Sequence, residues 1–189
     1  AYTARKAKLV MREMTDLLVL DLVDKGLVTD QMVLTVGYDI DNLLDSERRK
    51  RYTGPVVTDH YGRKIPKHAH GTASLSGHTS STREIVEAVM ALYDRIVDDD
   101  LLVRRMTIAA CHLLRETDVV PSGLGEQLNL FAAETLEDKE AVREKEKRRQ
   151  QAVIEIKKKF GKNAILKGMN LEEGATAMDR NRQIGGHKA

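Results

Sequence analysis

Aromatic side chains and cysteine are scarce in this chain of 189 residues. It contains no Trp, two Phe, five Tyr and a single cysteine, Cys111. The core must therefore be built from aliphatic side chains and methionine, and an internal disulfide framework is excluded. A lone cysteine is typical of a reducing compartment, so we expect a cytoplasmic protein.

The chain also lacks a long apolar run and a strong excess of charge of one sign. No segment approaches the roughly 18 apolar residues that span a bilayer, and no signal-peptide pattern opens the chain. Lys and Arg number 31 against 29 Asp and Glu, a formal net charge of +2. Any attraction to nucleic acid must therefore come from local clusters of charge.

Two segments have the apolar spacing of amphipathic helices. The first covers residues 3–25, is apolar almost all round in its second half, and is predicted to end at Gly26. The second begins with the capping-box pattern Ser81-Thr82-Arg83-Glu84 and continues to about Ile96. Both helices are expected to bury one face against a sheet.

Apolar and polar residues alternate over residues 32–38, 67–76 and 103–113, which predicts three strands. A small hairpin insertion is expected at about residues 45–66, with arms at Val56–Thr58 and Arg63–Ile65. The order of elements predicts an α+β domain over residues 1–118, an antiparallel sheet with two helices on one face. The uncovered face would carry the polar alternates of each strand.

Hydrogen-bond donors line one face of the strand at 67–76, opposite a face of small apolar residues. Two arginines begin the third strand, and two lysines extend the surface. Such donors match phosphate oxygens, and arginine adds charge and a bidentate geometry. The alternative is the ordinary solvent side of an antiparallel sheet. The candidate phosphate-binding residues are His68, His70, Thr72, Ser74, Ser76, Arg104, Arg105, Lys64 and Lys67.

The segment Gln127–Phe131 follows a turn-rich stretch and precedes a run dominated by charge. Its apolar side chains need either the core of the domain, as a final edge strand, or a hydrophobic pocket on another protein. We therefore expect a linker at residues 119–134 and leave both interpretations open. Residues 135–189 are expected to form a charged, solvated helix to about Phe160 and then a loose tail, with one short helix near 172–181.

The sequence predicts no catalytic and no metal-binding residues. No glycine-rich stretch matches a nucleotide-binding loop, and no constellation supplies both a nucleophile and a base. His68 and His70 are spaced as metal ligands can be, but no third ligand lies near them, so polar surface is favoured. Cys111 has no activating cation on its own strand face and is expected to be a buried structural thiol.

Several segments of the chain are informative when they are taken together and in order. They are Ala4–Lys8 through Gly26–Val28, His70–Leu75 leading into Thr79–Ile85, Val103–Met106, Gln127–Phe131, Phe160–Ile165 and Ile184–Ala189. In this order they resemble the little-finger domain of Y-family translesion DNA polymerases. The resemblance extends over most of the chain and is closest to the UmuC-like (ImpB/MucB/SamB) members of Gram-positive bacteria.

This resemblance implies the C-terminal portion of an error-prone polymerase of the SOS response. The sheet would contact the phosphates of template-primer duplex without reading sequence. Gln127, Leu128, Leu130 and Phe131 are similar to a peptide that binds the sliding clamp. The family's catalytic carboxylates and Mg²⁺ belong to a palm domain that has no counterpart here, so we expect no catalytic residue and no cofactor. The family's first strand would precede Ala1, and an open sheet edge could lead to self-association.

Two functions of other classes remain as alternatives. A stand-alone regulatory nucleic-acid-binding module would show sequence preference. A structural adaptor would pair with a partner through the helix at residues 136–160 and would not bind DNA. The lack of an apolar seam between Glu137 and Arg149 counts against a coiled coil.

Overall fold

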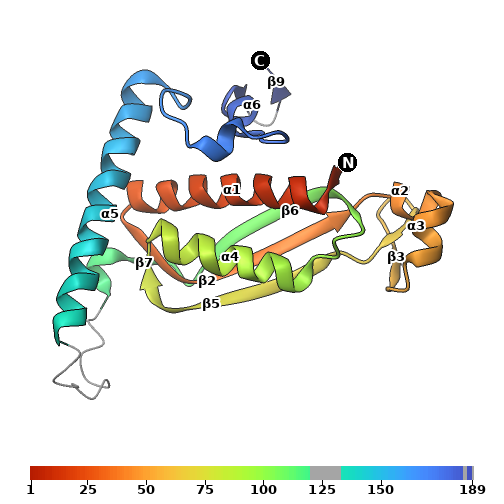
Figure 1. The fold of residues 1–189 in the computed structure, drawn as a ribbon, viewed down its shortest axis with the longest axis horizontal. Helices are drawn as coiled ribbons and strands as arrows, with labels where there is room; N and C mark the ends of the chain where they lie inside the picture. The colour runs from red at the N-terminus through yellow and green to blue at the C-terminus, as the bar shows by residue number, and fades with distance from the viewer. Residues whose placement is uncertain (120–132, 185–186, 189) are drawn as a thin grey trace.

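A computed structural model describes residues 1–119, 133–184 and 187–188. An antiparallel sheet is covered on one face by two helices, α1 (Ala4–Asp24) and α4 (Thr82–Ile96), as Figure 1 shows. The predicted α+β class is therefore confirmed. The sheet has the order β1 (Tyr2–Thr3), β6 (Leu102–Cys111), β2 (Leu27–Tyr38) and β5 (Ala69–Thr79), and β7 (Leu114–Arg115) pairs with the start of β2.

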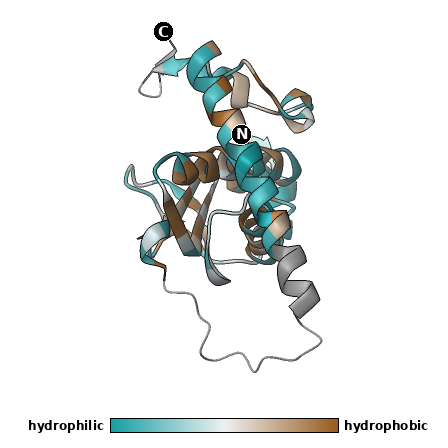
Figure 2. Cartoon of the chain, turned by 90° about the vertical axis from the view of Figure 1, so that its left-hand side faces the viewer, coloured by the Kyte–Doolittle hydropathy of each residue, from teal (hydrophilic) through white to brown (hydrophobic). Residues whose placement is uncertain are grey.

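The core lies between the central strand β2 and the two helices. Met32, Leu34 and Val36 of β2 are completely buried, and they alternate with half-buried residues that face away from the helices. Met11 of α1 is also completely buried. Figure 2 shows hydrophobic residues gathered in this layer, whereas the coloured part of α5 is mainly hydrophilic. The expected aliphatic, methionine-containing core is thus present.

Gly71 lets α4 pack closely against β5. A Cβ atom at this position would lie 2.9 Å from Leu92 Cδ1 and 3.1 Å from Ile96 Cγ2. Both distances are shorter than ordinary carbon contacts, so a side chain at this position would have to displace the ends of the Leu92 and Ile96 side chains. The close approach keeps the small apolar face of β5 under the helix, and its polar face outside.

The beginning of α1 is fixed by a cap and by a buried tyrosine. The Thr3 hydroxyl accepts a hydrogen bond from Lys6 N, and the Tyr93 hydroxyl of α4 donates to the Ala4 carbonyl at 2.8 Å. Burial of Tyr93 raises the pKa of its phenol, so the group stays neutral and can donate. This contact joins the two helices at one end of the domain.

The expected hairpin insertion is present and larger than predicted. Its strands β3 (Val56–Thr58) and β4 (Lys64–Pro66) pair as predicted, and two short helices, α2 (Asp41–Leu44) and α3 (Ser46–Arg51), precede them. Asn42 ties the insertion to the sheet. Its Nδ2 donates to the carbonyls of Asp39 and Leu102 at 2.9 Å each, and its Oδ1 accepts from Leu102 N at 2.7 Å.

The chain continues after the sheet through the short 3-10 helix η1 (Glu116–Asp118) and, beyond the undescribed segment, α5 (Ala133–Phe160). α5 lies at the end of the sheet opposite the insertion (Figure 1). Glu146 on α5 accepts hydrogen bonds from the Ser81 hydroxyl at 2.7 Å and from Arg83 N at 3.1 Å, at the N-terminus of α4. A carboxylate is favourable there because unpaired amides and the helix dipole are positive. The helix expected to be solvated is therefore attached to the domain.

Residues after α5 pack on the outer side of α1 through η2 (Gly168–Leu171) and α6 (Ala177–Asn181), followed by β8 (Gln183–Ile184) and β9 (His187–Lys188). The predicted short helix corresponds to α6, but the expectation of a loose tail is wrong for residues 163–182. Glu13, whose side chain is completely buried, accepts hydrogen bonds from Asn170 Nδ2, Thr176 N and Ala177 N at 2.9 to 3.0 Å. Within the described residues, no helix has the length and apolar character needed to cross a membrane.

Candidate nucleic-acid interface

The sheet face that the helices leave uncovered is called the open face here. Its side chains form cross-strand rows because the register pairs β2 with both neighbours. Thr35 lies opposite His70 of β5 and Thr107 of β6, and the next rows contain Thr72 and Ser74. The open face consists of Gln31, Val33, Thr35 and Gly37 of β2, His70, Thr72 and Ser74 of β5, and Arg105, Thr107 and Ala109 of β6.

A β-bulge brings two consecutive arginines to the exposed side of β6. Gly37 pairs with Arg105, but the next residue of β2 pairs with Val103, so Arg104 is the extra residue. Val103 is buried, both arginines are exposed, and Met106 again packs toward the core. In a regular strand one of the two arginines would point to the core. The bulge therefore doubles the positive charge at this end of the open face.

Acidic groups partly balance this charge. The corner with Arg104 and Arg105 forms a hollow of about 520 Å³ that also includes Asp39 and Arg63. Arg104 Nε lies 3.9 Å from Asp39 Oδ2, and the arginine side chain remains 71% exposed, so this pair is weak. Arg63 is bound more closely, at 2.7 Å from Asp59, and its hydrogen bond lowers the pKa of that carboxyl. The guanidinium of Arg104 is thus accessible to an anion.

The predicted site residues of β5 have the expected orientation. His70, Thr72 and Ser74 are exposed on the open face, and the His70 ring shares a hydrogen bond of 2.9 Å with the Thr35 hydroxyl. Lys67 and His68 are exposed just before the strand begins. These five residues form a continuous polar border along the edge strand.

Two predicted residues lie apart from this border. Ser76 lies within the irregularity where β5 and β2 lose their register, between Ser74 and Thr79, and it lines a groove with Arg83 near the start of α4. Lys64 is on the hairpin, where its Nζ donates to the Thr58 hydroxyl at 2.8 Å. The structure therefore does not bring these two residues together with the arginines.

Sequence reasoning missed polar residues on the two other strands. Gln31 and Thr35 are on the open side of β2, and Thr107 is on that of β6. The alternation of polar and apolar residues in β2 was a usable signal, because every second residue must face away from the core. Arg63 was also missed as a neighbour of the two arginines, since only the fold brings the hairpin to that corner.

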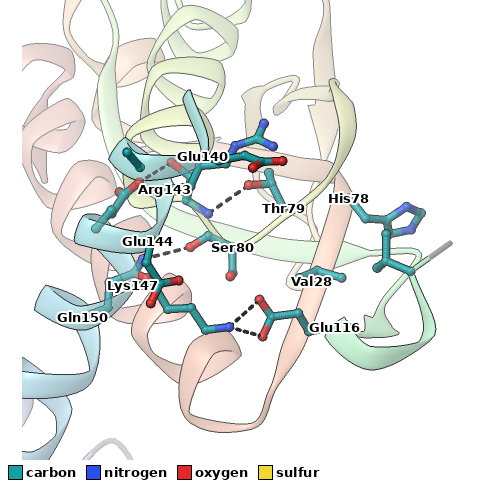
Figure 3. Close-up of a pocket in the computed structure, with 14 residues that line it drawn as sticks. Val28, His78, Thr79, Ser80, Glu116, Glu140, Arg143, Glu144, Lys147 and Gln150 are labelled. Atoms are coloured by element: carbon teal, nitrogen blue, oxygen red, sulfur yellow. Dashed lines mark hydrogen bonds and ion pairs between the residues drawn. The ribbon is translucent and has the colours of Figure 1, made fainter. Parts of the chain in front are cut away.

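A cleft of about 800 Å³ lies between α5, η1 and the loop before α4 (Figure 3). Ion pairs and hydrogen bonds cross it. Lys147 lies 2.8 Å from Glu116, and Gln150 donates to the Ser80 carbonyl at 2.8 Å. Figure 3 shows these side chains pointing toward each other across the cleft. The cleft is accordingly the attachment site of α5.

In the part of the chain that the structure describes, no three His, Cys, Asp or Glu side chains are placed to hold a metal ion. Cys111 is half-buried at the end of β6. The candidate clamp-binding residues, Gln127, Leu128, Leu130 and Phe131, lie outside the described residues, so both interpretations of that segment stay open.

The structure is thus an α+β domain whose antiparallel sheet carries helices on one face and exposed polar side chains on the other. Residues 2–130 match the impB/mucB/samB family C-terminal domain. The match covers more than half of the chain, so the chain belongs to this family, which forms the C-terminal region of Y-family translesion DNA polymerases. Comparisons with curated proteins and with solved structures gave no match.

Proposed function

We propose that this chain holds template-primer DNA and recruits the sliding clamp for an error-prone translesion polymerase. The open face contacts the phosphates of the duplex without reading its sequence. The observation that carries this proposal is the row of exposed donors on β5 beside two arginines that a bulge turns outward. Donors and guanidinium groups on a sheet match phosphate oxygens, and such contacts position a protein without specifying a sequence.

The salt dependence of duplex binding tests this proposal. Replacing both Arg104 and Arg105 with Ala removes up to two phosphate contacts, so the slope of log K against log salt should fall by up to about 1.8. The matched control replaces Arg5 and Arg12, two exposed arginines of α1 on the helical side, and should leave the slope unchanged. Equal slopes for the Arg104/Arg105 variant and the wild type would remove the arginines from the contact surface.

Clamp recruitment is assigned to Gln127–Phe131. Leu130 and Phe131 would fill an apolar pocket of the clamp, and Gln127 would form a hydrogen bond at its rim. Replacing Leu130 and Phe131 with Ala should abolish clamp binding in a pull-down while circular dichroism and the melting temperature stay at wild-type values. Loss of the folded state in this variant would instead place the peptide in the core.

Finer assignments are part of the same proposal. They are membership of the UmuC-like group of Gram-positive bacteria, a role in the SOS response, a cytoplasmic location, and Mg²⁺ use confined to a palm domain. Self-association also belongs to this proposal. Among the described strands, β1 pairs along the outer edge of β6 and covers only Leu102 and Val103, which leaves backbone groups of that edge for a second copy. Light scattering over a concentration series would detect a dimer.

Two competing functions have distinct outcomes in the same binding assays. A regulatory module would prefer some duplexes in a random-sequence selection, whereas phosphate contacts predict no enrichment. A structural adaptor that uses α5 would show no DNA binding. The attachment of α5 to the N-terminus of α4 through Glu146 already occupies part of the surface that such pairing would need.

A further inference from the structure

The tip of the inserted hairpin exposes the most accessible tyrosine among those the structure describes. Tyr61 is 78% exposed, whereas Tyr38 and Tyr93 are buried and the Tyr52 hydroxyl donates to the Pro55 carbonyl at 2.8 Å. Aromatic residues are scarce in this chain, and the others named here support the fold. A ring this exposed contributes nothing to the core and is accessible to a ligand.

The tip is held in one conformation. Asp59 Oδ1 accepts hydrogen bonds from Tyr61 N and Arg63 N at 2.9 Å each, and Gly62 takes a positive φ of 77° to complete the turn. Asp59 Oδ2 also accepts from Arg63 Nε at 2.8 Å. The backbone on both sides of Tyr61 is thus fixed before any ligand arrives, which lowers the entropy cost of binding.

The ring of Tyr61 is oriented by its neighbours. The Arg63 guanidinium carbon lies 5.0 Å from the ring centroid, and the His60 ring meets it edge-on at 5.4 Å with an interplanar angle of 72°. A tyrosine ring with a guanidinium over one face combines a stacking surface on its other face with a phosphate-binding group. These are the two elements that bind a single-stranded nucleic acid.

The hairpin also lies in the right place for such a ligand. Arg63 and Ile65 line the same hollow as Arg104 and Arg105. A strand that left a duplex on the open face at this end would therefore reach the hairpin next. The insertion also carries basic residues that are exposed or half-exposed, which are Arg48, Arg49, Lys50, Arg51 and Lys64.

We propose that Tyr61 stacks on an unpaired base of a single-stranded extension of the bound duplex, with Arg63 beside it to contact the adjacent phosphate. This site is distinct from the open face but rests on the proposed duplex contact for its position. Stacking is tolerant of sequence, because every base has a flat face. The hairpin would therefore add affinity for any extension, whatever its sequence.

The test compares a blunt duplex with the same duplex carrying an extension of about six nucleotides, in either polarity, a length within the site sizes of single-strand binders. Tyr61→Ala should lower affinity for an extended duplex about 5- to 150-fold and leave blunt-duplex affinity unchanged. Tyr61→Phe keeps the ring and should bind like the wild type. Leu44→Ala, which removes another exposed apolar side chain of the insertion, should have no effect.

A 2-aminopurine base in the extension gives an independent reading, since stacking quenches its fluorescence and Tyr61→Ala should restore it. Equal affinity of Tyr61→Ala and the wild type for both extended duplexes would overturn the hairpin site. An equal loss on blunt and extended duplexes would also overturn it, because Tyr61 would then act on duplex binding in general. Failure of the blunt duplex to bind the wild type would refute the open-face proposal, and extension-dependent binding would still report on the hairpin.

Discussion

Replacing Glu13 should release the C-terminal segment from α1 without unfolding the domain. The Glu13 carboxylate is completely buried and accepts hydrogen bonds from the amides of Thr176 and Ala177 and from Asn170 and Arg180, all within 3.2 Å. Glu13→Ala leaves these donors without an acceptor. Burial lowers the pKa of the Arg180 guanidinium and Glu13 opposes that shift, so the arginine loses its compensating charge.

The magnitude follows from these contacts. Breaking a buried pair by removal of one partner costs about 3–5 kcal/mol, and the segment can avoid that cost by leaving the surface. The cost of undocking residues 163–182 should therefore fall by about 3 kcal/mol, which raises the undocked population roughly 150-fold. The sheet and the α1–α4 core make few of their contacts with this segment, so the melting temperature should change little.

Hydrogen exchange measures this release directly. The amides of Thr176 and Ala177 should exchange faster in Glu13→Ala, whereas those of Leu34 and Val36 in β2 should not change. Asp21→Ala on the same helix removes an exposed pair with Lys25, worth about 0.3–0.5 kcal/mol, and should leave the segment protected. Unchanged protection of Thr176 and Ala177 in Glu13→Ala, or cooperative loss of the whole domain, would refute this reasoning.

Three further perturbations test the packing that supports the open face. Gly71→Val places side-chain atoms within about 3 Å of Leu92 and should lower the free energy of unfolding in urea by about 1–3 kcal/mol. The control Gly77→Ala adds a Cβ with nothing within 4 Å and should change that free energy by under about 0.5 kcal/mol. Equal effects of the two substitutions would contradict the close approach of α4 to Gly71. Tyr93→Phe removes the bond to the Ala4 carbonyl and should cost about 1 kcal/mol at pH 8. Burial raises the pKa of Tyr93, so the stabilisation by its neutral hydroxyl is complete below about pH 10 and is lost as pH rises further. The difference in free energy of unfolding between the wild type and Tyr93→Phe should therefore narrow by pH 11. A difference that stays constant with pH would be inconsistent with the raised pKa. Glu146→Ala should free α5 and speed hydrogen exchange of the Arg83 amide several-fold. The control Glu155→Ala, on the same helix, should leave this exchange rate unchanged. Identical rates in the two variants would show that Glu146 does not attach α5.

The main elements of the fold were predictable because their signals are local. Periodicity indicated α1, α4 and the three long strands, and the Ser81 cap marked the start of α4, where its hydroxyl accepts from Glu84 N at 3.3 Å. The polar face of β5 followed from alternation alone. These features depend on residues that are neighbours in sequence, and a single sequence contains that information.

The tail and the insertion were not predictable in the same way. Glu13 and Asp16 are charged, so periodicity assigns them to solvent, yet a segment more than 150 residues away covers them. The short helix α3 has four consecutive basic residues and no apolar face, which leaves only its Asp45 cap as a signal. Both results arise from tertiary contacts that local patterns do not encode.

The bulge is an intermediate case. An apolar–polar–polar–apolar run at Val103–Met106 breaks the period of two, and this break was visible in the sequence. The pattern could not identify the residue of the neighbouring strand that pairs with the bulge. The fold shows that Gly37 lies opposite Arg105, so the two arginines stand at the corner next to the hairpin.

Site-specific cross-linking to duplex DNA tests the central claim most directly. In a Cys111→Ser background, a single cysteine at Thr72 on the open face, carrying a photoactivatable group, should cross-link to blunt duplex. The same group at Glu87, exposed on the helical side of the domain, should not. Cross-linking from Glu87 but not from Thr72 would place the DNA on the helices and contradict the account.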